Sequence, residues 1–308
     1  MKSKLQILFL TLFLATAGYA QTREAQEYLH QGVILAKENR LEEALKIFDS
    51  VKIMDPLYAE AYFNSGLTNN KLERHRPTLR DMSIAVYLDN TLQEAYYVRG
   101  LSYYALNVTD SAMIDLRRAV GSDPANPEKL YSLAKLYESL EDDDDALEYY
   151  AKTLEFDSTY SNARYNRALL LAKKGATSDA LLDLNKLIEK DSLDAQYLFG
   201  RGAVYAQMNS FYNAILDFTK SIQLNPEDYQ SWFNRGLCYY FTRQYVKAQT
   251  DFEETIRLEN NYGLAFYYLG LLYMDKNNFE KACESWHAAK SRDNSESEDY
   301  IIKYCKSN

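Results

Sequence analysis

Residues 229–262 read YQSWFNRGLCYYFTRQYVKAQTDFEETIRLENNY, and residues 93–126 read QEAYYVRGLSYYALNVTDSAMIDLRRAVGSDPAN. Placed one above the other, the two stretches share Arg-Gly-Leu at positions seven to nine and Tyr-Tyr at eleven and twelve. They also share Ala at position 20 and Asp at position 23. The pattern returns eight times at a fixed period of 34 residues. A period of this length is typical of a solenoid, in which each unit contacts only its neighbours.

The eight units are numbered one to eight in chain order, and the positions within each unit run from one to 34. The predicted repeats cover residues 25–58, 59–92, 93–126, 127–160, 161–194, 195–228, 229–262 and 263–296. Each unit holds two stretches with apolar residues at helical spacing. The first has them at positions four, eight and eleven, and the second at 20, 24 and 27. The sequence therefore predicts a pair of helices in every repeat.

Small side chains mark the places where the two helices of a repeat are expected to touch. Position eight is Gly or Ala in every repeat, and position 20 is Ala in every repeat except the second, which has Thr78. Two helices approach closely only where neither carries a bulky side chain, and larger neighbours fill the remaining space. Position 15 is Asn or Gly in five repeats, which favours a left-handed backbone conformation at the end of the first helix.

The unit resembles the tetratricopeptide repeat. The resemblance rests on the small residue at position eight, Tyr at eleven, Ala at 20, an aromatic residue at 24 and Pro at 32, and it covers residues 25–296. It implies an all-α, right-handed superhelix whose first helices form a concave, ligand-binding face. Residues 297–308 carry Tyr300, Ile301 and Tyr304, and we expect them to form a capping helix over the last repeat.

Four repeats carry Arg at position seven and Asp at position 23. The arginines are Arg99, Arg167, Arg201 and Arg235, and the aspartates are Asp115, Asp183, Asp217 and Asp251. This co-occurrence predicts that the two side chains meet across each helix pair, as bidentate ion pairs. The alternative is that the arginines line the groove and bind an acidic partner. Repeat two has an aspartate, Asp81, without the arginine.

The predicted partner-binding residues are aromatic side chains at position five of the first helices. They are Phe63, Tyr97, Tyr131, Tyr165, Phe199, Phe233 and Tyr267. Rigid aromatic rings suit a bound peptide, and tyrosine faces also suit sugar rings. Two functions follow: a scaffold that binds a protein or peptide in the concave groove, or a glycan or cell-wall binding module. A third interpretation is that the same rings only pack between neighbouring repeats.

The other motifs argue against catalysis and nucleic acid. His30, His75 and His287 are too far apart in the sequence for a metal site or a shared base. We found no phosphate-binding glycine loop and no nucleophile motif, so we expect a protein that is not an enzyme and has no cofactor. The net charge of −9 is the wrong sign for binding phosphates.

The first 20 residues are interpreted as a secretory signal peptide. Lys2 and Lys4 precede an apolar run over 5–17, which is shorter than the roughly 18 residues of a membrane-spanning helix. An uncleaved N-terminal anchor is the alternative. The expected mature chain begins near Gln21 and is exported, to the periplasm or outside the cell. Of three cysteines, Cys283 and Cys305 could pair in an oxidising compartment, but we expect separate thiols.

Overall fold

The computed structural model describes residues 23–305, and the predicted signal peptide lies outside the described residues. Within 23–305 the regular structure is helical throughout, with no strand. The all-α fold class is therefore confirmed, as helix pairs in tandem with a C-terminal capping helix.

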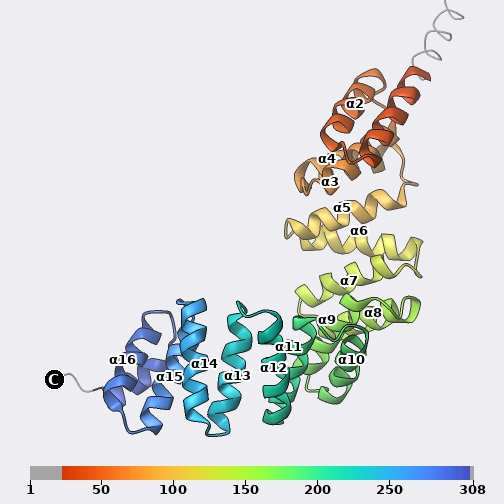
Figure 1. The fold of residues 1–308 in the computed structure, drawn as a ribbon. Coiled ribbons are helices and arrows are strands. Elements are labelled where there is room, and N and C mark those ends of the chain that lie inside the picture. Colours follow the sequence, from red (N-terminus) through yellow and green to blue (C-terminus); the bar gives the residue numbers. More distant parts are fainter. Residues whose placement is uncertain (1–22, 306–308) are drawn as a thin grey trace, which may run out of the picture. The chain divides into compact units, whose positions relative to one another are not determined.

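A helical segment over residues 23–37 comes first, and helices α2 to α16 of those that follow are labelled in Figure 1. Their bounds are α2 Leu41–Met54, α3 Ala59–Lys71, α4 His75–Leu88, α5 Gln93–Ala105, α6 Thr109–Ser122, α7 Pro127–Ser139, α8 Asp143–Phe156, α9 Ser161–Lys173, α10 Thr177–Lys190, α11 Ala195–Gln207, α12 Phe211–Leu224, α13 Tyr229–Phe241, α14 Tyr245–Leu258, α15 Gly263–Asp275, α16 Phe279–Lys290 and α17 Glu296–Tyr304.

The chain divides between Thr159 and Tyr160 into two compact units. Within each unit, the two helices of a repeat pack on each other, for example α5 on α6 and α11 on α12. The second helix of a repeat then packs on the first helix of the next, as α4 does on α5 and α12 on α13. First helices of successive repeats also touch within a unit, which places their side chains along a common surface.

Position eight packs against position 24 of the same repeat. Every position-24 side chain is fully buried, and the eight are Phe48, Met82, Leu116, Tyr150, Leu184, Phe218, Phe252 and Trp286. A methyl group added to Gly202 or Gly236 would lie only 2.9 Å from the ring of Phe218 or Phe252. The predicted reason for small residues at this position is therefore confirmed.

Position 15 has a positive φ in all eight repeats, including the three in which the sequence did not predict it. Asn39, Asn107, Gly175, Asn209 and Asn277 have the expected left-handed conformation. Glu73, Glu141 and Arg243 adopt it as well, with φ between 57° and 59°. A side chain without Asn or Gly character is disfavoured in this region. The helix-ending turn therefore keeps one conformation whichever residue stands at this position, which is consistent with control by the packing of the two helices.

The C-terminal cap is joined to the last repeat by a disulfide. Cys283 of α16 is bonded to Cys305, which directly follows α17, and their Cα atoms are 5.6 Å apart. The expectation of separate thiols was therefore wrong for this pair. The reason is that α17 folds back onto α16, where the Tyr300 ring lies 4.9 Å from that of Trp286. Cys238 is a buried free thiol.

Candidate functional site

The four predicted arginine–aspartate pairs all form. Arg201 donates from Nε and Nη2 to the two carboxylate oxygens of Asp217, both at 2.8 Å. Arg235 binds Asp251 with the same geometry and the same two distances. The pairs Arg99–Asp115 and Arg167–Asp183 are bidentate as well. Each joins a first helix to the second helix of its own repeat.

Two of these arginines also bond to the preceding repeat, and one of them lies over an aromatic ring of its own helix. Arg201 Nη1 donates to Asn185 of α10 at 2.9 Å, and Arg235 Nη1 donates to Thr219 of α12 at 3.2 Å. The Arg235 guanidinium lies 4.8 Å from the centre of the Trp232 ring. The bond to Asp217 raises the pKa of Arg201. These contacts support a structural role for the arginines over recognition of an acidic partner.

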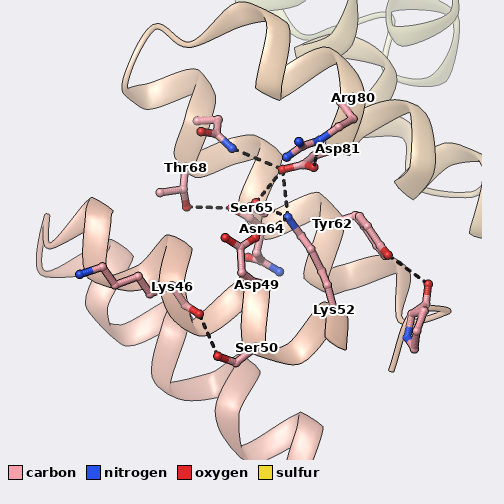
Figure 2. Close-up of polar contacts among 12 residues, drawn as sticks. Lys46, Asp49, Ser50, Lys52, Tyr62, Asn64, Ser65, Thr68, Arg80 and Asp81 are labelled. Atoms are coloured by element: carbon pink, nitrogen blue, oxygen red, sulfur yellow. Dashed lines mark hydrogen bonds and ion pairs between the residues drawn. The ribbon is translucent and has the colours of Figure 1, made fainter. Parts of the chain in front are cut away.

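Repeat two uses a different cation for the same carboxylate (Figure 2). Asp81 is 1% exposed and accepts hydrogen bonds from Ser65 at 2.7 Å and Lys52 at 3.1 Å. Asn69 donates to the same oxygen at 3.3 Å, and Arg80 Nε lies 3.2 Å from the other. Lys52 comes from α2 of repeat one, so this cluster binds two successive repeats together.

The predicted partner-binding rings are less exposed than expected for side chains that line an open groove. Tyr97, Tyr165, Phe233 and Tyr267 are buried, with 5–8% of their surface exposed, and Phe63, Tyr131 and Phe199 are half-buried. Their role in binding stays a prediction.

Two of these rings illustrate how position five packs. The Phe199 ring lies 5.7 Å from that of Phe218, at position 24 of its own repeat. The Tyr165 hydroxyl donates to the main-chain oxygen of Gln196 in the next repeat at 3.3 Å. Burial raises the pKa of Tyr165 to about 12, so this hydroxyl stays protonated at neutral pH. Position five therefore contributes to packing both within a repeat and between repeats, and leaves only part of each ring for a ligand.

Two hollows lie between first helices of the second unit. The first, called the apolar pocket, has a volume of about 170 Å³. Its walls include Ala206, Phe211, Asn234, Leu237, Cys238 and Phe241. The rings of Phe211 and Phe241 stack at 5.8 Å, and 54% of the Phe241 surface is exposed. Burial raises the pKa of the Cys238 thiol to about 12, which keeps this wall uncharged.

The second hollow, called the polar pocket, has a volume of about 270 Å³. Its lining includes the rings of Tyr165 and Phe199 and the polar side chains of Gln196, Asn225, Asp228 and Gln230. Asp228 caps the N-terminus of α13, and its carboxylate accepts hydrogen bonds from the backbone amides of Gln230 and Ser231. Both pockets border α13, on the surface formed by first helices.

The sequence analysis missed both pockets. For the apolar pocket the signal was a small residue, because Ala206 stands at position twelve, where Tyr104, Tyr240 and Met274 stand in three other repeats. A small residue forms no recognisable motif. A pocket beside it can be identified only when the positions of the surrounding side chains are known.

Over residues 23–305, no group of three or more His, Cys, Asp or Glu side chains is placed to hold a metal ion. Within the same range, no helix combines the length and the apolar character needed to cross a membrane.

Fold and surface define a class of protein, an α-solenoid built from stacked helix pairs. Models of the tetratricopeptide repeat match residues 97–161, 195–228 and 218–250. The chain therefore contains tetratricopeptide repeats.

Solved structures agree on the fold. A tetratricopeptide repeat protein from Parabacteroides merdae is 17% identical, with a TM-score of 0.64 over 80% of this chain and 98% of that one. PilF of Pseudomonas aeruginosa is 21% identical, with a TM-score of 0.59 over 70% of this chain and 98% of that one. YrrB, described as a TPR protein with an unusual peptide-binding site, is 22% identical, with a TM-score of 0.50 over 61% of this chain and 97% of that one. No curated protein matches the chain.

Proposed function

We propose that this chain is an exported scaffold that binds a protein or peptide partner on the surface formed by its first helices, and that it acts by binding and not by catalysis. The observation that carries this proposal is the character of that surface. It combines partly exposed apolar side chains with two pockets, while the arginines that could have bound an acidic ligand are bonded to aspartates.

Two further observations support the proposal. Leu169, at position nine of α9, is 38% exposed although it is a large apolar residue on a first helix. A large apolar side chain that stays partly exposed on this surface can add to a contact with a partner. One structure of similar fold belongs to a protein described as having a peptide-binding site, so this fold can carry such a site.

Export is supported by two independent features. The first is the basic and then apolar start of the sequence, which is typical of a cleaved signal peptide. The second is the Cys283–Cys305 disulfide, because disulfides form and persist mainly in oxidising compartments. We propose the periplasm as the compartment, with secretion as the alternative. A mature N-terminus near Gln21, read by mass spectrometry, is the expected result.

The second candidate function is binding of a glycan. The polar pocket favours it, because it combines two aromatic rings with amide and carboxylate side chains. Sugars present hydroxyl groups and an apolar ring face, which such a lining can contact.

The test compares the two faces of one repeat. The chain without residues 1–20 is used to select binders from a library of random twelve-residue peptides, and a panel of soluble glycans is tested in parallel. Leu169→Glu charges the first-helix surface, and its matched control, Leu182→Glu, charges a 60% exposed residue of α10. We expect selected peptides to lose at least tenfold in affinity with Leu169→Glu and to be unaffected by Leu182→Glu. Retention of glycans with no selected peptide would favour the alternative.

A further inference from the structure

The two pockets lie along one face of α13. Gln230 borders the polar pocket, while Asn234, Leu237 and Phe241 border the apolar one. These residues are spaced by three or four, so they share a side of the helix. From Gln230 to Phe241 the helix rises about 16 Å. An extended chain covers that distance with about five residues. One peptide segment can therefore reach both pockets.

The apolar pocket has the size of one aromatic side chain. A cavity of about 150 Å³ with apolar walls is large enough to hold a benzene ring, and this pocket has a volume of about 170 Å³. Its walls offer two stacked rings at 5.8 Å and a leucine. An incoming ring would therefore be surrounded by the offset and edge contacts that aromatic groups prefer.

The polar pocket is rich in acceptors and has one charged side chain among its lining residues, Asp228. Its carboxylate accepts three hydrogen bonds, from two backbone amides and the Ser231 hydroxyl. A carboxylate has about four acceptor positions, so one remains for a ligand. Asp194 caps the adjacent helix α11 directly before Ala195 and Gln196 of the pocket lining, and so adds a second negative charge at this end. A cationic group complements this end of the surface.

We infer that this surface of α13 binds an extended peptide with an aromatic side chain in the apolar pocket and a lysine or arginine about five residues away at the polar pocket. The inference rests on the proposed peptide-binding function and adds the class of peptide. Apolar burial supplies most of the affinity, and the cation sets the direction of the peptide and makes binding sensitive to salt.

The test uses the peptides selected from the random library and two synthetic series derived from them. In one series the aromatic residue is changed to Ala, and in the other the basic residue is changed to Glu. Affinity is measured by fluorescence anisotropy at low and moderate salt. We expect about tenfold weaker binding without the ring and about threefold weaker binding without the cation.

Variants of the protein locate each contact. Ala206→Met fills the apolar pocket, and Ala36→Met is its control at the same position of repeat one. Phe241→Ala removes an exposed wall of the pocket and serves as a second variant if Ala206→Met alters folding. Asp228→Asn removes the charge but keeps the helix cap, because Asn and Asp cap equally well. Only Ala206→Met and Phe241→Ala should reduce the preference for the ring, and only Asp228→Asn should reduce the preference for the cation.

The outcomes separate this inference from the function on which it rests. Peptides that bind, and that Leu169→Glu weakens, but that lack an aromatic and basic pair would overturn the inference and leave the function standing. An equal effect of Ala206→Met and Ala36→Met on peptide affinity would also overturn it. If the library yields no binder and glycans are retained, both proposals are wrong.

Discussion

Repeat two and repeat six bury an aspartate at the same position but neutralise it differently. In repeat six, Arg201 of α11 holds both oxygens of Asp217 at 2.8 Å. In repeat two the equivalent position is Ser65, and the cation is Lys52 from the preceding repeat, 3.1 Å from Asp81. The comparison teaches that a cation near the buried carboxylate is required, whereas the helix that supplies it can change.

Asp217 and Asp81 differ in the number of side chains that donate hydrogen bonds to them. Asp217 depends on one guanidinium, whose two bonds are lost together. Asp81 is surrounded by Ser65, Lys52 and Arg80 (Figure 2), and Asn69 donates a hydrogen bond to it as well. A carboxylate with several independent donors should tolerate the loss of one of them. This difference sets the order of the predictions that follow.

The largest effect is expected for Arg201→Met. The change leaves the carboxylate of Asp217 buried without its cation, and breaking such a pair costs about 3 kcal/mol of unfolding free energy. Chemical denaturation measures the loss, and hydrogen exchange should place it in α11 and α12. The double variant Arg201→Met with Asp217→Leu should recover most of the stability, because no buried charge is left. A double variant as unstable as the single one would contradict this explanation.

A smaller loss is expected for Lys52→Met in repeat two. The side chain of Lys52 is 11% exposed, and removing its charge still leaves Asp81 with two neutral donors and Arg80. We expect a loss of about 1.5 kcal/mol in the unfolding free energy, the lower end of the range for one hydrogen bond to a charged group. Because Lys52 belongs to repeat one, faster hydrogen exchange should appear in both α2 and α4. A loss as large as that of Arg201→Met would show that the neutral donors do not compensate.

The sequence predicts the Arg201–Asp217 pair but not the Lys52–Asp81 pair, for a physical reason. Arg201 and Asp217 lie in the same repeat at a spacing that three other repeats share, so their contact can be found by comparing copies. Lys52 lies 29 residues before Asp81, in another repeat, and no second copy shows the pattern. The disulfide at Cys305 was unpredictable for a similar reason, because the capping helix lies outside the periodic part of the chain.

In the candidate site, too, the periodic features could be predicted from the sequence and the non-periodic ones could not. The periodic rings at position five were readily found, but their burial depends on the size of neighbours in the adjacent repeat. Tyr165 is 8% exposed, whereas Tyr131, at the same position, is half-buried. The apolar pocket arises from Ala206, a small residue whose effect depends on Phe211 and Phe241. Period and register determine the helices, and the local differences in side-chain volume determine the surface.

The smallest effect concerns position 15, where repeat two has Glu73 and repeat six has Asn209. Both residues have a positive φ, 57° and 56°. Asn tolerates this region better than Glu, because its short side chain can bond to the local backbone. Glu73 is exposed, so Glu73→Asn should leave its surroundings unchanged and raise the unfolding free energy by about 0.5 kcal/mol.

The reciprocal change, Asn209→Glu, should lower the unfolding free energy by a similar amount, and chemical denaturation of both variants measures the two shifts. Opposite signs are expected because the turn geometry is the same in both repeats and only the residue differs. If both substitutions destabilised the chain, Glu73 would have to make a favourable contact of its own in repeat two. The two repeats would then differ in the turn as well as in the cation, and packing of the helix pair alone would not explain why all eight turns have one conformation.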